Sequence, residues 1–244
     1  MIDTEVKINP QIFNKIKNTK IFFKRQSAYQ KYKEIFNINK FLRRDTHYIK
    51  YCIKNFKILD GLCLEFGTYK GERIKQISKC LQKKYHYIPD HHKHRIAYGF
   101  DSFEGLSEEW IEPETNKLIK DKKAFNLDGK LPNINKKGYF PNVCLVKGYF
   151  EDSIPKFLSK NNVDQIALLH VDCDLKSSTI DIFENISHLI KVGTLILFDD
   201  FHNVGCTQWW DEYYVFETYA KKYNWKYKIV ACVIDGGQTA VVIE

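Results

Sequence analysis

The sequence predicts an α/β fold: a doubly wound, mostly parallel seven-stranded sheet with an N-terminal helical extension. From about residue 58, short apolar runs of strand length alternate with segments that have a helical pattern, as in parallel sheets. The last two runs are separated by a short segment containing Gly236 and Gly237, which predicts an antiparallel finish. The predicted strands are 58–66, 95–100, 142–147, 165–171, 193–198, 226–234 and 239–243. The predicted helices of this region are 71–84, one starting near 153, 178–190 and 207–222.

Charge divides the chain into two predicted regions, a helical extension at 1–57 and a main domain at 58–244. The extension holds 14 Lys and Arg against 4 Asp and Glu, whereas the main domain holds 24 against 26. A basic surplus suits nucleic acid, an anionic surface or a phosphate-bearing substrate. A solvated helical face explains the surplus better, and we favour that interpretation over nucleic-acid binding. The extension can also build a homodimer.

Composition restricts the class of protein further. The chain has 244 residues, enough for one sizeable core, and 44% hydrophobic with 28% charged residues excludes disordered and fibrous classes. No apolar stretch approaches the roughly 18 residues of a membrane helix, and the first residues lack a secretory pattern. Seven cysteines without a Cys-x-x-Cys pair argue against a disulfide framework. We therefore expect a cytoplasmic protein with reduced thiols.

The functional residues of such a sheet follow the strands, because ligands bind beyond the carboxyl ends. Gly67 and Gly71 follow the first strand directly after Glu65, an arrangement that suits a cationic ligand group and is not a phosphate-binding glycine motif. Asp101 follows the second strand, where an acidic side chain can accept both hydroxyls of a ribose or can cap a turn. Gly148 follows the third strand; beyond it, Asp152 or Ser153 can cap a helix near Pro155, and Phe150 can border a flat base.

Three aspartates follow the fourth and fifth strands, Asp172 after one and Asp199 with Asp200 after the other. Neighbouring parallel strands end side by side, so these carboxylates are expected to converge. Converging carboxylates need a cation, and hard oxygen ligands suit Mg²⁺ or Mn²⁺. The alternative is that one or two of them only cap helices.

The ordered set of strand-end motifs resembles the macrocin O-methyltransferase family. The motifs are Glu65-Phe66-Gly67-Thr68-Tyr69-Lys70-Gly71, Gly99-Phe100-Asp101-Ser102-Phe103, Gly148-Tyr149-Phe150-Glu151-Asp152, His170-Val171-Asp172-Cys173-Asp174-Leu175 and Phe198-Asp199-Asp200-Phe201. The resemblance implies a Rossmann-like, S-adenosylmethionine-dependent enzyme that methylates sugar hydroxyls with a divalent metal. The positions are similar, more distantly, to catechol O-methyltransferase.

The resemblance also implies a role for each strand-end residue. The methionine end of the cofactor would contact Glu65, Phe66, Gly67, Thr68 and Tyr69. The adenosine would contact Asp101, Ser102, Phe103, Gly148, Phe150 and Glu151. Asp172, Asp199 and Asp200 would bind Mg²⁺ or Mn²⁺, with Asp172 also at the cofactor and among the catalytic groups.

The acceptor and the general base are less constrained. His202 and Lys176 follow the predicted metal ligands closely and are our candidates for proton removal. His170, inside a strand, is interpreted as a satisfied core histidine. Lys176 and Arg73 depart from the family pattern. We expect a sugar or nucleotide-sugar acceptor; the alternatives are a catechol-type phenol, or an RNA-modifying protein that uses the basic extension.

Overall fold

The computed structural model describes residues 41–42, 47–85, 96–112, 116–135, 137–201, 211–233 and 237–244. Its main feature is an eight-stranded sheet in the order β1-β9-β10-β8-β7-β2-β3-β6. All neighbouring strands pair in parallel except β10, which is antiparallel to both β8 and β9. The doubly wound, mostly parallel sheet with an antiparallel finish is therefore confirmed.

The elements have the following bounds. The strands of the large sheet are β1 Phe41–Leu42, β2 Leu62–Phe66, β3 Ala97–Asp101, β6 Val143–Lys147, β7 Ile166–Val171, β8 Ile190–Phe198, β9 Tyr227–Val233 and β10 Thr239–Ile243. A separate hairpin consists of β4 Trp110–Glu112 and β5 Lys117–Lys120. The helices are α3 Tyr48–Asn55, α4 Glu72–Tyr85, α5 Phe150–Lys160, α6 Lys176–Ile186 and α7 Asp211–Lys222, with the 3₁₀ turn η3 Ser187–Leu189.

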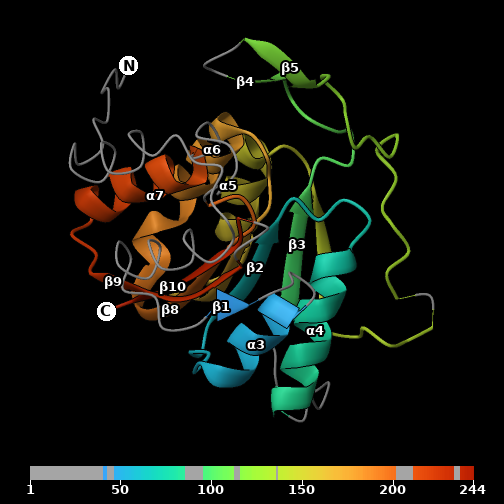
Figure 1. The fold of residues 1–244 in the computed structure, drawn as a ribbon. Helices are drawn as coiled ribbons and strands as arrows, with labels where there is room; N and C mark the ends of the chain where they lie inside the picture. Colours follow the sequence, from blue (N-terminus) through green and yellow to red (C-terminus); the bar gives the residue numbers. More distant parts are fainter. Residues whose placement is uncertain are drawn as a thin grey trace.

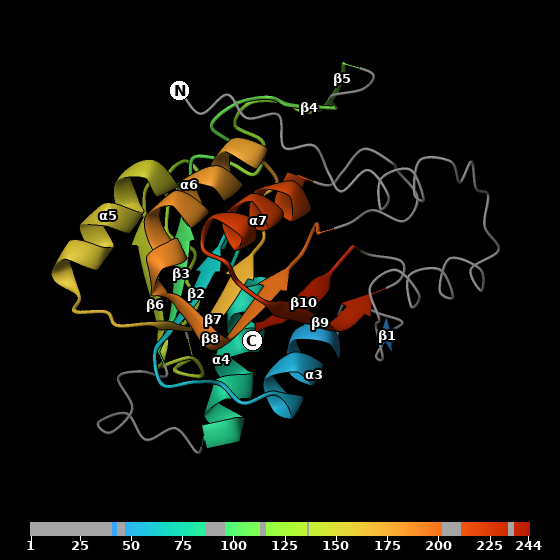
Figure 2. The same cartoon turned by 90° about the vertical axis from the view of Figure 1, so that its left-hand side faces the viewer.

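Helices cover both faces of the sheet (Figures 1 and 2). Helices α5, α6 and α7 lie on one face, and α3 and α4 lie on the other. Strand β7 lies in the middle and is buried at every position, which explains its continuous apolar run. Each face has its own hydrophobic core, so side chains that alternate along a central strand are buried in both directions.

Aromatic rings dominate the core under α6 and α7. The Phe183 ring is fully buried and lies 6.3 Å from the Phe198 ring, 6.2 Å from Phe216 and 5.6 Å from Tyr219, measured between centroids. Phe198 in turn lies 4.7 Å from Phe201, directly beyond the carboxyl end of β8. This cluster therefore anchors the chain that carries Asp199 and Asp200.

The seven predicted strands are all present, and the structure adds three. Two of these form the β4–β5 hairpin within the polar excursion of residues 104–141, and it projects beyond the strand ends in Figure 1. The third, β1, comes from the extension and pairs with β9 over two residues. Helix α5 begins at Phe150, earlier than predicted. Its N-cap residue is Tyr149, which makes no side-chain cap hydrogen bond to any described residue. The predicted cap at Asp152 or Ser153 is thus wrong, because both residues lie inside the helix.

The extension contributes to the core through α3, whose residues Tyr48, Ile49, Cys52 and Ile53 are buried in the cluster beneath the sheet. The other predicted helices of 1–57 lie outside the described residues, as does the start of the helix predicted at 207–222. Six cysteines are described, and all are free thiols. Within the described ranges, no helix combines the length and apolar character that crossing a membrane requires.

We predict that Phe183→Ala lowers the free energy of unfolding by about 3–5 kcal/mol, because it leaves a cavity among several buried rings. Urea denaturation measures the loss. Val192→Ala is the control, since that side chain is 71% exposed and truncation there should change stability by less than about 0.5 kcal/mol. Equal losses in the two variants would contradict the assigned core.

Candidate active site

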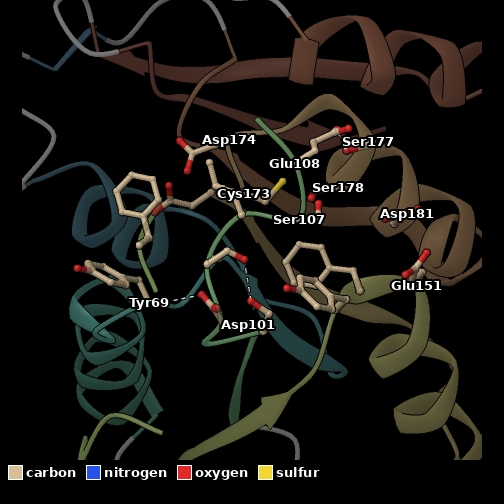
Figure 3. Close-up of a pocket in the computed structure, with 18 residues that line it drawn as sticks. Tyr69, Asp101, Ser107, Glu108, Glu151, Cys173, Asp174, Ser177, Ser178 and Asp181 are labelled. Atoms are coloured by element: carbon tan, nitrogen blue, oxygen red, sulfur yellow. Dashed lines mark hydrogen bonds between the residues drawn. The ribbon is translucent and has the colours of Figure 1, made fainter. Parts of the chain in front are cut away.

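A cavity of about 470 Å³ lies at the carboxyl ends of β2, β3, β6 and β7 (Figure 3). Its wall includes Gly67 after β2, Asp101 at the end of β3, Tyr149 after β6 and Asp172 after β7. This is the edge at which open α/β sheets bind ligands. Residues from four strand ends therefore converge on one concave site, and Gly67, Asp101 and Asp172 are among those predicted from the sequence.

The turn after β2 brings two strand ends into direct contact. Gly67 has φ +93°, and a Cβ atom there would lie 1.6 Å from the carbonyl oxygen of Asp172. The Asp172 amide donates to the carbonyl of Phe66 at 2.9 Å, and the Gly67 amide donates to that of Phe100 at 2.9 Å. Only glycine permits this approach, so the turn forms a narrow, rigid wall of the cavity.

Asp101 is held in place by two backbone amides. Tyr69 donates to its Oδ2 at 2.7 Å and Phe103 donates to its Oδ1 at 2.6 Å, and Figure 3 shows the first of these bonds. Burial raises the pKa of Asp101, while both hydrogen bonds act in the opposite direction. The carboxylate keeps spare lone pairs, so it can accept the two hydroxyls of a ribose.

The opposite end of the cavity is lined by acidic and hydroxyl side chains. Glu151 and Asp181 lie together on the side away from Tyr69 in Figure 3. Ser177 at the start of α6 donates to Glu108 at 2.5 Å, which joins the loop after β3 to that helix. Six carboxylates line the cavity: Asp101, Glu108, Glu151, Asp172, Asp174 and Asp181. Among its described lining residues there is no Lys or Arg, so the cavity favours a cationic ligand.

The predicted cofactor residues divide into two groups. Those that line the cavity are Gly67, Tyr69, Asp101, Ser102, Phe150, Glu151 and Asp172. The other predicted residues, Glu65, Phe66, Thr68, Phe103 and Gly148, are not part of its wall. Phe66 and Phe103 are fully buried, and Thr68 donates to Glu65 at 3.0 Å behind the turn. The second group therefore supports the site from behind.

The predicted metal ligands lie side by side next to this cavity. The Asp199 amide donates to the carbonyl of Val171 at 2.9 Å, which extends the β7–β8 pairing by one residue and places Asp199 beside Asp172. Burial raises the pKa of Asp172, and the neighbouring Asp199 and Glu65 raise it further. Burial, with Asp199 and Asp174 nearby, raises the pKa of Asp200 to about 7. These carboxylates repel one another in a poorly solvated place.

Several protein groups surround the aspartates. Arg73 approaches Asp199 with 3.7 Å between Nη2 and Oδ1, and Gln238 donates to the same oxygen at 3.2 Å. Glu212 on α7 is 2% exposed, and its Oε2 accepts the Asp200 amide at 3.1 Å. Burial and the charges of the three aspartates raise the pKa of Glu212. Among the described residues, Arg73 is the cation that approaches this group of carboxyls, and its ion pair is with Asp199.

The donor set fits a divalent cation. One ring nitrogen of His170 and one carboxylate oxygen each of Asp172 and Asp199 lie within 4.8 Å of one another. Among the described residues, the buried side-chain atoms without a hydrogen-bond partner are His170 Nε2, Glu212 Oε1 and Gln238 Oε1. All three belong to residues of this cluster. Buried polar atoms normally have partners, so an ion and its water ligands would satisfy an otherwise incomplete site.

Asp174 is a site residue to which the sequence analysis gave no role. It lines the cavity, and its φ of +63° is unusual for a residue other than glycine. The tight turn that includes the Leu175 amide and the Cys173 carbonyl, 2.6 Å apart, produces this conformation. Burial and the nearby Asp199 raise the pKa of Asp174 to about 6. The sequence signal that could have identified Asp174 is its position as the second acidic residue of Asp172-Cys173-Asp174, directly after a strand.

Of the two candidate bases, the structure describes only Lys176, which is not part of the cavity wall. Lys176 begins α6 with a side chain that is 57% exposed, and its Nζ lies 4.0 Å from Oδ1 of Asp211. His202 lies outside the described residues. His170 is fully buried as expected, and its Nδ1 lies 3.3 Å from Oε1 of Glu65, whereas its Nε2 has no hydrogen-bond partner within the described part of the chain.

Glu108, Phe125 and Asp181 also line the cavity and were missed. The first two lie in the long excursion, where no periodic pattern marks a ligand-facing residue, and the third lies on a helix.

Comparison with known proteins identifies the family. The family model described as macrocin O-methyltransferase matches residues 49–221, which is more than half of the chain. The chain belongs to the macrocin O-methyltransferase family. This member is accordingly an S-adenosylmethionine-dependent O-methyltransferase, as its strand-end motifs suggested. No curated protein matches it significantly in sequence.

Solved structures show the same fold. The calicheamicin methyltransferase CalS11 aligns with a TM-score of 0.59 and 16% identity, over 96% of this chain and 91% of the other. The O-methyltransferase NovP aligns with a TM-score of 0.52 and 20% identity, over 80% of this chain and 78% of the other. The Rossmann-like methyltransferase fold is thereby confirmed for this family member.

We predict that the metal-free protein becomes less stable as pH rises from 5 to 7, and that Asp200→Asn makes this decline shallower. A carboxyl with a raised folded-state pKa binds its proton more tightly in the folded state than in the unfolded state, where the pKa is about 3.9. Stability is then lost between about pH 4 and the folded value near 7. Urea denaturation in a chelator at several pH values measures the slope.

The exposed Asp128 provides the matched control, and Asp128→Asn should leave that slope unchanged. The assignment would be contradicted if Asp200→Asn and Asp128→Asn followed the wild-type pH dependence alike.

Proposed function

We propose that this O-methyltransferase transfers the methyl group of S-adenosylmethionine to a sugar hydroxyl, aided by Mg²⁺ or Mn²⁺ at Asp172, Asp199 and Asp200. One observation carries the proposal: Asp172 belongs both to the wall of the acidic cavity and to the carboxylate cluster. A methyl donor in the cavity and an acceptor at the cluster would therefore meet at this residue. Alignment of this kind lowers the barrier of a bimolecular step.

The cavity residues bind and orient the donor. S-adenosylmethionine, when bound, supplies a methyl group that its sulfonium charge has already activated. Asp101 would accept the ribose hydroxyls, and Phe150 with Glu151 would border the adenine. Gly67 and Tyr69 would contact the methionine end, with Glu65 behind them. The six carboxylates of the wall match the positive charge of this ligand.

The aspartate cluster would hold the cation through hard oxygen ligands. A divalent ion there supplies a Lewis acid that lowers the pKa of an acceptor hydroxyl. The residues around it keep the ligands oriented: Gln238 and Arg73 contact Asp199, and Glu212 accepts the Asp200 amide. Such outer contacts commonly determine how well a site retains its metal.

Asp174 is the best-placed described residue to remove the acceptor proton. Asp174 lines the cavity two residues after Asp172, whereas the Lys176 side chain is 57% exposed and its Nζ lies 4.0 Å from Oδ1 of Asp211. In the proposed reaction, the acceptor oxygen would bond to the methyl carbon while the carbon–sulfur bond breaks, which would release S-adenosylhomocysteine. The Asp174 carboxylate would accept the hydroxyl proton. Asp172, His202 and Lys176 stay our other candidates for this chemistry.

The acceptor class is a sugar, nucleotide-linked or in a glycoside. The family takes its name from macrocin, and the CalS11 structure is titled a TDP-rhamnose 3'-O-methyltransferase. The basic residues of 1–57 suit a phosphate-bearing acceptor. We also propose that residues 1–57 form an extension to a methyltransferase domain at 58–244. The protein is proposed to be cytoplasmic and homodimeric, without a nucleic-acid partner.

An acceptor screen tests the proposal. We expect labelled methyl transfer from S-adenosylmethionine to nucleotide sugars or glycosides, detected by mass spectrometry of the product. Catechols form the matched comparison set, because a catechol-type enzyme would methylate them in preference. Transfer to catechols alone would contradict the sugar assignment while leaving the enzyme class intact.

We predict that Asp199→Ala lowers turnover at least about 1000-fold and changes S-adenosylhomocysteine affinity by less than about 3-fold, because Asp199 is not part of the cavity wall. Calorimetry measures the affinity. A chelator should abolish turnover of the wild type, and Mg²⁺ or Mn²⁺ should restore it. Undiminished turnover, in the variant or in the chelator, would exclude the metal role.

A further inference from the structure

We propose that His170 is an additional ligand of the metal site, and that this nitrogen makes the site prefer Mn²⁺ or Co²⁺ to Mg²⁺. The proposal rests on the metal role proposed above and extends it from an all-oxygen set to a mixed one. It starts from the position of His170 within β7, two residues before Asp172, so both side chains point to the same face of the sheet.

The geometry brings His170 into the cluster. A ring nitrogen of His170 and carboxylate oxygens of Asp172 and Asp199 lie within 4.8 Å of one another. In an octahedral site with bonds of about 2.1 Å, the ligand atoms lie roughly 3–4.2 Å apart. The three side chains are thus already close to the separation that a shared small cation requires. The carboxylate of Asp200, in contrast, does not belong to this closest group.

The second observation is an unsatisfied buried atom. His170 is 0% exposed, and its Nε2 has no hydrogen-bond partner among the described residues. Its other ring nitrogen, Nδ1, lies 3.3 Å from Oε1 of the equally buried Glu65. An unpartnered nitrogen in such a place is destabilising, so it needs an explanation.

The contact with Glu65 determines which nitrogen is available. When Glu65 is ionised it can only accept, so Nδ1 carries the proton and Nε2 presents its lone pair. Because Nδ1 is held by Glu65, the proposal takes Nε2 as the nitrogen that joins the oxygens of Asp172 and Asp199. A cation there would convert the repulsion among these atoms into coordination.

Glu65 in turn is held by Thr68, whose hydroxyl donates to Oε2 at 3.0 Å. The chain Thr68–Glu65–His170 has the form of the carboxylate–histidine–metal arrangement that orients ligating imidazoles. Glu65 and Thr68 are therefore positioning residues. They also connect the glycine turn of the cavity to the metal cluster, which accounts for the absence of Glu65 from the cavity wall.

A nitrogen ligand changes which ion is preferred. Carboxylate oxygens suit Mg²⁺ and Mn²⁺ alike, whereas imidazole suits later first-row ions and Mg²⁺ binds it poorly. A set of one imidazole and two or three carboxylates should follow the order Mg²⁺ < Mn²⁺ < Co²⁺. Removal of the imidazole should make the affinities for Mg²⁺ and Mn²⁺ more alike.

The test measures metal binding without turnover, on untagged full-length protein. Calorimetry gives the affinities for Mn²⁺, Co²⁺ and Mg²⁺ in the wild type and in His170→Asn. We expect the variant to lose about 10–100-fold in Mn²⁺ affinity and to change Mg²⁺ affinity by less than about 3-fold. Pulsed electron paramagnetic resonance of the Mn²⁺-loaded wild type should detect one directly bound nitrogen, absent from His170→Asn.

Two further variants make the result specific. His202→Gln keeps the nitrogen signal if His170 is its source and loses it if the histidine after β8 is the ligand. Glu65→Gln should lower Mn²⁺ affinity less than His170→Asn does. Circular dichroism verifies that each variant is folded, S-adenosylhomocysteine binding provides a second check for the histidine variants, and an unfolded His170→Asn is replaced by His170→Gln.

A Mn²⁺ site without nitrogen coupling, or unchanged Mn²⁺ affinity in the folded His170 variant, would overturn the inference. If Asp199→Ala abolished Mn²⁺ binding in that case, the proposal that the aspartates bind a metal would still stand. Wild-type protein that binds none of the three ions would refute the metal role itself. The acceptor screen still decides separately whether the enzyme methylates sugars.

Discussion

The parallel pairing of β7 with β2 and β8 is the constraint on which the site depends. It aligns Phe66, Val171 and Phe198 across three strands, so that the residues after them meet at one edge. Gly67 and Asp172 then touch through their backbones, and Asp199 lies beside Asp172. The cavity and the carboxylate cluster are thus two sides of one junction.

This junction has an electrostatic cost. Asp172, Asp199, Asp200 and Glu212 come together in a place with little solvent, and the carboxyl pKa values of Asp172, Asp200 and Glu212 rise accordingly. Buried like charges are unstable unless they are protonated or compensated by cations. The extensive aromatic packing under β8 can support such a strained edge. A cation bound there would relieve the repulsion and bring the acceptor to the methyl donor.

The sequence allowed good prediction wherever a local pattern carried the information. Continuous apolar runs marked all seven strands, and the residues directly after them included Gly67, Asp101, Asp172 and Asp199. The sequence did not identify Asp174, Glu108 and Glu212 as site residues, because their roles come from contacts between distant segments. The Glu65–His170 contact, for example, joins residues 105 positions apart. Strand β1 escaped for a related reason, since two residues are too few to show a pattern.

The sequence by itself determined the alternation of strands and helices, the edge that binds ligands and the motifs that place the chain in its family. These features follow from the periodicity of apolar side chains and from the acidic residues and glycines that stand directly after the strands. Only the tertiary structure decided which residues line the cavity, which support it from behind, and that Nε2 of His170 has no hydrogen-bond partner among the described residues. Burial and satisfaction of a polar atom depend on every neighbour in space, and a linear pattern does not contain those neighbours.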